Sequence, residues 1–225
     1  MSFEFLLIII IGIIGMVVQA RLQHIFSQYS QVPFANGMTG REVAEKMLRD
    51  HGIYDVKVIS TRGHLTDHYN PANKTVNLSE SVYSNCSVAA AAVAAHECGH
   101  AVQHAREYAP LKLRSALVPI VSFSSMWSTW IVIIGILMIN TMPAIFWLGI
   151  AMIAMSALFS LITLPVEYNA SDRALDWLQN NNILVGKQFT QAQVALQWAA
   201  RTYLVAALSA IATLIYYLGF ARNRD

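Results

Sequence analysis

The chain has 225 residues, of which 56% are hydrophobic and 12% charged. This composition is too apolar for a soluble globular protein of that length, and it indicates a membrane protein. The 15 Lys and Arg residues nearly balance the 13 Asp and Glu residues, and the net charge of +2 gives no basic surface of the kind that binds nucleic acid.

The first predicted element is an apolar helix over residues 1–20. This segment approaches the roughly 20 residues that a helical membrane span needs. A signal peptide is the alternative, because Val18-Gln19-Ala20 resembles a small-residue cleavage site. The residues before the apolar run include Glu4 but no Lys or Arg, which a signal peptide should carry. We therefore expect a retained N-terminal membrane anchor.

Residues 21–114 are expected to form a catalytic α+β region that faces water. Thr39-Gly40-Arg41-Glu42 is a capping-box pattern, and it predicts a helix that continues to about His51. Alternating residues predict strands over 56–60 and 74–79, and Asn70-Pro71-Ala72-Asn73 predicts a turn between them. An exposed edge at strand 74–79 could pair with an extended substrate; an ordinary core strand is the alternative.

Residues 115–166 contain no charged side chain and predict a transmembrane helical hairpin. About 50 residues in one helix would extend about 75 Å, which is too long for a hydrocarbon core about 30 Å thick. Asn140-Thr141-Met142-Pro143 supplies the turn between two spans. Residues 202–225 predict a last span and tail, because an apolar stretch lies between Arg201 and Arg222. The count is about four transmembrane helices.

Residues 167–201 form the second predicted catalytic segment. The pattern indicates a helix to about Gln179, a break over residues 180–182, and a new helix capped by Thr190 with Gln193. The predicted fold class is thus an α+β membrane protein that is mainly helical, with a small zincin-like catalytic unit.

The chemistry of the chain is indicated by His96-Glu97-Cys98-Gly99-His100, which matches the pattern H-E-x-x-H. The Ala-rich stretch before it predicts a helix, on which residues i and i+4 share a face and can bind one zinc ion. A third protein ligand and a water would complete a tetrahedral site. Glu97 would take the proton of the attacking water. A chance match is the alternative, but two buried histidines and a glutamate without a metal would be costly.

The third ligand must emerge on the same side of the membrane as His96 and His100. Two crossings return the chain to that side, and the first charged residue after them is Glu167. Asp172 is the competing ligand. A carboxylate that merely stabilises a helix N-terminus is the structural alternative for Glu167.

These motifs resemble those of a known family. The segment 96–100, followed after two spans by Pro165-Val166-Glu167-Tyr168-Asn169-Ala170-Ser171, resembles the bacterial membrane neutral zinc metallopeptidases of the YugP type. The likeness covers most of the chain. More distantly, it is similar to the membrane gluzincins of the heat-shock and CAAX prenyl protease type. The resemblance implies His96, His100 and Glu167 as ligands of one Zn²⁺ per chain and Glu97 as the general base.

One position departs from the more distant group, which carries Asp four residues after the glutamate to orient a ligand histidine. This chain has Ser171 there, and either Ser171 or Asp172 could take that role.

Other candidate residues surround the motif. His104 is expected to support the site or lie on the surface rather than bind the ion. His64, His68 and Tyr69 are candidates to polarise the scissile carbonyl, and the sequence does not choose among them. Cys98 points round the helix from the metal face and is expected to pack in the core.

The function that these patterns favour is a membrane-embedded zinc metallopeptidase, an endopeptidase that cleaves peptides or membrane-protein segments at the lipid bilayer. A non-catalytic zinc-binding scaffold or assembly partner is the alternative, but it would not need Glu97. An intramembrane protease would need the histidine motif inside a span, and a metal transporter would need ionisable residues there. An oligomer or a regulatory membrane partner stays open.

The expected location is the cell membrane, with several crossings. Basic residues gather near the span ends on the catalytic side, and the positive-inside bias then places this side in the cytoplasm. These residues are Arg21, Arg106, Lys112, Arg114, Arg173, Lys187 and Arg201.

Overall fold

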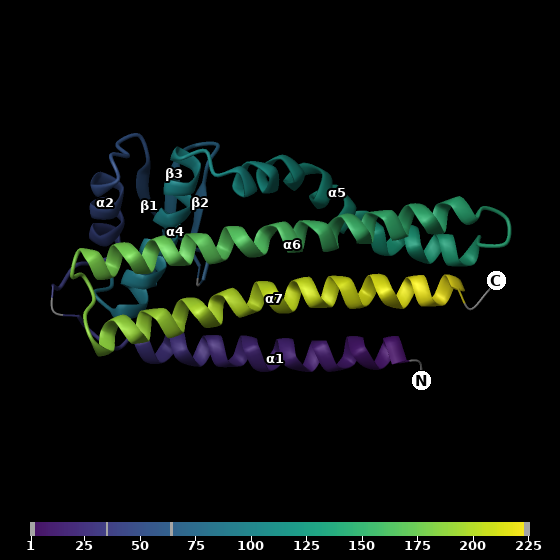
Figure 1. The fold of residues 1–225 in the computed structure, drawn as a ribbon, viewed down its shortest axis with the longest axis horizontal. Helices are drawn as coiled ribbons and strands as arrows, with labels where there is room; N and C mark the ends of the chain where they lie inside the picture. Colours follow the sequence, from purple (N-terminus) through teal and green to yellow (C-terminus); the bar gives the residue numbers. More distant parts are fainter. Residues whose placement is uncertain (1–2, 35, 64, 223–225) are drawn as a thin grey trace. The chain divides into compact units, whose positions relative to one another are not determined.

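The computed structural model describes residues 3–34, 36–63 and 65–222. This part of the chain is mainly helical with a small sheet, as predicted (Figure 1). The elements in chain order are α1 (Phe3–Tyr29), α2 (Gly40–Asp50), β1 (Lys57–Thr61), β2 (His68–Asn70), β3 (Thr75–Ser79), α3 (Glu80–Tyr83), α4 (Val88–Ala105), α5 (Ala109–Leu137), α6 (Pro143–Asn180) and α7 (Lys187–Arg222).

The chain divides into two compact units. One combines Met1–Val18, Lys112–Pro165 and Thr202–Asp225, and the other combines Gln19–Leu111 and Val166–Arg201. We call the first the membrane unit and the second, which holds the residues of the predicted site, the catalytic unit. The four long helices, α1, α5, α6 and α7, contribute residues to both units.

Within the described residues, four helices are long and apolar enough to cross a membrane, namely α1, α5, α6 and α7. The predicted turn before Pro143 is confirmed, because α5 ends at Leu137 and α6 begins at Pro143. The two helices approach closely in the membrane unit. A Cβ at Gly135 would lie 2.4 Å from the Cα of Phe146, so only glycine permits this contact. Val132, Phe146 and Ile150 form a buried cluster beside it.

Two long helices differ from the prediction. Helix α6 continues without a break through Pro165 to Asn180, so the second catalytic segment begins inside a helix. Helix α7 begins at Lys187, and the predicted cap at Thr190 is wrong. The Thr190 hydroxyl instead donates to the carbonyl of Gly186, one turn earlier.

The catalytic unit contains a three-stranded sheet with the order β1-β3-β2. Strand β3 is central and fully buried, because Val76 pairs with Val58 in parallel β1 and with Tyr69 in antiparallel β2. The prediction of an exposed edge at 74–79 is therefore wrong. Strand β2 was not predicted. It has three residues, and the last of them, Asn70, belongs to the segment that was predicted as a turn. The two edges of this sheet are β1 and β2, and β2 packs against α4.

Helix α2 begins as its capping box predicts. Thr39 is the N-cap, its side chain accepts from the backbone N–H of Glu42, and the Glu42 carboxylate accepts from the backbone N–H of Thr39. The helix ends at Asp50, and Gly52 follows with φ +72°. Its buried face packs on α4 through Val43, Ala44 and Met47, which are fully buried.

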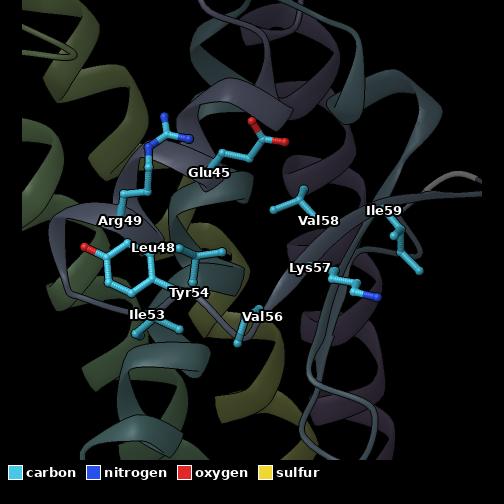
Figure 2. Close-up of a pocket in the computed structure, with 9 residues that line it drawn as sticks. All are labelled: Glu45, Leu48, Arg49, Ile53, Tyr54, Val56, Lys57, Val58 and Ile59. Carbon is cyan, nitrogen blue, oxygen red and sulfur yellow. The ribbon is translucent and has the colours of Figure 1, made fainter.

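A hollow of about 390 Å³ lies between α2 and the β1 edge of the sheet (Figure 2). Its floor is apolar, with Leu48, Ile53 and Val58, and Glu45 and Arg49 lie on the α2 side. The sheet order places this hollow at the opposite edge from β2.

The capping box gives a first prediction. Thr39→Ala removes the acceptor for the Glu42 N–H, and it should lower the free energy of unfolding of the catalytic unit by about 1 kcal/mol. Thr39→Ser keeps the hydroxyl and should restore most of the loss. Thermal and denaturant unfolding of the purified protein in detergent, followed by circular dichroism, measures both. Equal stability of Thr39→Ala and the parent chain would contradict the role of the cap.

Candidate metal centre

Helix α4 places the two histidines of the motif on one face. Ser87 caps the helix by accepting from the backbone N–H of Ala90, and the run of alanines that follows is buried. His96 and His100 are one turn apart, with ring centroids separated by 4.9 Å at an interplanar angle of 84°. Both rings thus converge on one region beside the helix.

Helix α6 brings a carboxylate to the same region. Oε2 of Glu167 lies 3.3 Å from Nε2 of His96 and 3.5 Å from Nε2 of His100. One donor atom from each of these three residues lies within 4.8 Å of the others. The Glu167 residue is only 2% exposed. The sequence prediction placed these three residues in one site, and the structure brings them together.

The approach of α4 to α6 depends on Gly99. A Cβ at this position would lie 2.5 Å from the carbonyl oxygen of Ala170 and 3.1 Å from its Cα. Real Cβ atoms are not found so close to backbone atoms. The missing side chain therefore lets the helix that carries the histidines reach the helix that carries Glu167.

Gln103 selects one tautomer of the neutral His100 ring. Its Nε2 donates to the carbonyl of Val166 at 2.8 Å and to Oδ1 of Asn169 at 3.0 Å. Its Oε1 lies 3.0 Å from Nδ1 of His100 and can only accept. The neutral His100 ring therefore carries its hydrogen on Nδ1, and its Nε2 presents a lone pair to the carboxylate.

Ser171 contacts the other histidine. Its hydroxyl lies 3.1 Å from Nδ1 of His96, which leaves Nε2 of His96 directed to Glu167. Asp172, the competing ligand in the sequence analysis, is exposed and is not a member of the cluster. Of the two residues proposed to orient a histidine, it is thus Ser171 that makes the contact.

The donor set suits a zinc ion. The lone pair of His100 Nε2 and a carboxylate oxygen face each other, and the His96 ring can add a second lone pair. Such groups repel one another unless a cation or a proton lies between them. Two imidazole nitrogens and one carboxylate oxygen form a common protein ligand set of catalytic zinc, which leaves a fourth position open. Contacts from Gln103 and Ser171 to the outer ring nitrogens complete the arrangement that zinc-binding histidines usually have.

Glu97 lies beside this cluster in a buried position. The residue is 8% exposed, and burial raises the pKa of its carboxyl to about 7. The carboxylates of Glu167 and Asp67 add to this rise, whereas His96 and a hydrogen bond from the backbone N–H of Tyr69 lower the pKa. The bond from Tyr69 connects Glu97 to the edge strand β2.

The remaining candidates occupy other positions. His104 is not in the cluster, and its Nδ1 lies 2.7 Å from the hydroxyl of Tyr69. Burial raises the pKa of that hydroxyl to about 12. His68 is exposed and bonds to the carbonyl of Thr66. His64 lies outside the described residues.

Cys98 is fully buried, as predicted, and points to α2. Its Sγ lies 3.5 Å from the carbonyl of Ala44. Burial raises the pKa of this thiol well above its usual value, so it stays protonated at neutral pH.

Two residues of the site were missed from the sequence. Gln103 and Asn169 bridge α4 and α6 by a hydrogen bond, and Asn169 also accepts from Nε of Arg173 at 2.8 Å. A signal for Gln103 was present, because residue i+3 from His100 lies on the metal face of the helix. Asn169 gave no such signal, since its role depends on the distance between two helices.

Known proteins match the whole chain. The family model described as "Putative neutral zinc metallopeptidase" matches residues 4–222. The "Putative membrane protease YugP" of Bacillus subtilis (strain 168) is 38% identical over 226 residues, which cover 100% of this chain and 99% of the relative. No solved structure matches the chain.

The Gln103 network gives the second prediction. Gln103→Leu keeps the approximate volume but removes the acceptor that orients His100, so zinc affinity should fall by about 10- to 100-fold. Gln179→Leu, an exposed position on α6, is the matched control and should keep the affinity. Competition with a zinc chelator on the purified variants measures both values. An unchanged affinity in Gln103→Leu would show that His100 needs no such partner.

Proposed function

Because the chain belongs to the neutral zinc metallopeptidase family, we propose that it hydrolyses peptide bonds at a single zinc ion held by His96, His100 and Glu167, with Glu97 as the general base. The observation that carries the proposal is the convergence of the three ligand atoms within 4.8 Å. A glutamate on the later helix as third ligand is the gluzincin arrangement.

The residues of the chain would divide the reaction between them. Zinc, when bound, lowers the pKa of a coordinated water towards 7 and polarises a carbonyl. The Glu97 carboxylate would accept the proton of the attacking water and pass it to the leaving amine. Burial of Glu97 and Glu167 keeps bulk water from their oxygens, which strengthens each electrostatic contact. Gln103 and Ser171 would hold the two imidazoles in place.

A peptide substrate would lie along β2. This strand is a sheet edge in the described part of the chain, and the Tyr69 N–H that bonds to Glu97 belongs to it. An extended chain that added to this edge would present its carbonyl beside Glu97. The accessible part of the site is on the His96 side, whose side chain is 14% exposed against 3% for Glu167. We propose an endopeptidase that takes peptides or membrane-protein segments.

The rival functions fit less well. A zinc-binding scaffold would not need a buried carboxylate next to the ligands, and Glu97 provides one. An intramembrane protease would carry the motif in a span, but α4 is not among the four candidate spans of the described residues.

The third prediction separates metal binding from proton transfer. Glu97→Gln keeps the size but cannot accept a proton, so turnover should fall by roughly 10² to 10⁴ while zinc stays near one per chain. Glu167→Ala deletes a ligand, so zinc content and activity should fall together. Asp172→Ala is the exposed control and should keep its zinc. Elemental analysis and a peptide cleavage assay decide this. Full zinc in Glu167→Ala with loss in Asp172→Ala would assign the third ligand to Asp172.

The fourth prediction concerns orientation in the cell membrane. The basic residues near the span ends place the catalytic side in the cytoplasm by the positive-inside bias. In a chain with Cys86 replaced by serine, Arg62→Cys should not react with a membrane-impermeant thiol reagent in intact cells. Asn140→Cys, in the exposed turn between α5 and α6, should react and serves as control. Labelling at position 62 with protection at position 140 would show that the catalytic side faces outward, opposite to this prediction.

A further inference from the structure

A second cavity in the catalytic unit lies at the beginning of α4. It has a volume of about 210 Å³ and is bounded by α1, by the ends of the strands and by Ala89 and Ala90 of α4. Among the described residues that line it, hydroxyl groups are frequent and Asp67 is the one ionisable side chain, with no Lys, Arg or His. Five serines contribute to it, namely Ser27, Ser30, Ser79, Ser81 and Ser87.

The carboxylate of Asp67 is held in a fixed position. Its Oδ1 accepts from the backbone N–H of Ser79 at 2.7 Å, and the Ser79 hydroxyl lies 3.0 Å from both carboxylate oxygens. The Ser79 hydroxyl in turn lies 3.2 Å from that of Ser81. An ionised carboxylate has about four acceptor sites, and in the described part of the chain Ser79 offers Asp67 two hydrogens. Acceptor capacity is therefore left for a ligand in the cavity.

The cavity lies on the same helix face as the catalytic residues. Ala89 and Ala90 precede His96 and Glu97 by seven residues, which is two helical turns or about 10.5 Å. In an extended peptide, with about 3.3 Å per residue, this distance corresponds to about three residues. Asp67 also directly precedes β2, the strand along which the substrate is proposed to lie.

We infer that this cavity is a specificity subsite that binds a lysine or arginine side chain of the substrate within about three residues of the scissile bond. The inference rests on the proposed peptidase function. One fixed carboxylate among hydroxyl oxygens, with no cation among the described lining residues, is complementary to an ammonium or guanidinium group. The cavity volume of about 210 Å³ is that of about seven water molecules in the liquid, at about 30 Å³ each. This volume suits one long side chain.

The test uses the full zinc-loaded chain in detergent and a set of matched peptides. Lysine, arginine or norleucine is placed in turn at each of the three positions on either side of the cleaved bond. Norleucine has the aliphatic stem of lysine without its charge. The parent chain should prefer the cationic residue at one position by at least tenfold in kcat/KM. In Asp67→Asn, the preference at that position should fall below about threefold.

Two further variants keep the test decisive. Glu45→Gln is the control. It removes a carboxylate that lines the hollow between α2 and β1 and not the proposed subsite, so it should keep the tenfold preference. Ser81→Lys places an ammonium group beside Asp67, and it should abolish the preference even if Asp67→Asn fails to fold. Zinc content of each variant reports whether its catalytic unit is intact.

The outcomes separate this inference from the proposed function. Cleavage of the peptides with no cationic preference at any position, or a preference that survives in both Asp67→Asn and Ser81→Lys, would overturn the subsite alone. If no peptide is cleaved, binding of the peptides to the Glu97→Gln variant, measured by fluorescence polarisation, still tests the subsite. Peptides that bind with a cationic preference but are never cleaved would overturn the peptidase function alone. Neither binding nor cleavage would overturn both.

Discussion

The structure of the catalytic unit depends on one electrostatic constraint, which is the convergence of His96, His100 and Glu167. Atoms that carry lone pairs repel one another at 3.3 to 3.5 Å in a buried site unless a cation or a hydrogen lies between them. Zinc is the cation that we propose, and in its absence a proton on an imidazole would have to serve. The two cases differ in geometry, because a proton joins two of these atoms whereas zinc can bind all three.

Several features of the fold serve to bring these three residues together. Gly99 allows α4 to approach the backbone of α6, and Gln103 then joins the two helices through Val166 and Asn169. Gln103 is fully buried, and each polar atom of its amide has a partner. The same hydrogen bonds that hold the helices together therefore also set the hydrogen position on His100. Helix packing and ligand orientation are not independent in this site, so a change at Gln103 acts on both.

The sequence was informative where the chemistry is local. The motif spacing predicted that His96 and His100 share one face of a helix, and the capping box predicted the beginning of α2. The position of Glu167 beside the two histidines was also predicted, because counting membrane crossings brings distant segments to one side. Features that depend on tertiary contacts were not predicted correctly. The central position of β3, the existence of β2 and the role of Asn169 are set by strand pairing and by helix approach, which local patterns do not encode. The predicted cap at Thr190 failed because its hydroxyl bonds within the helix instead.

X-ray absorption at the zinc edge of the purified, zinc-loaded protein tests the central claim most directly. The account predicts one zinc per chain with nitrogen and oxygen ligands at about 2.0 to 2.2 Å, two of them imidazoles, and no sulfur. A sulfur ligand at about 2.3 Å would assign a cysteine to the metal and contradict the account. A third imidazole would contradict it equally, because it would replace Glu167 by another histidine such as His104.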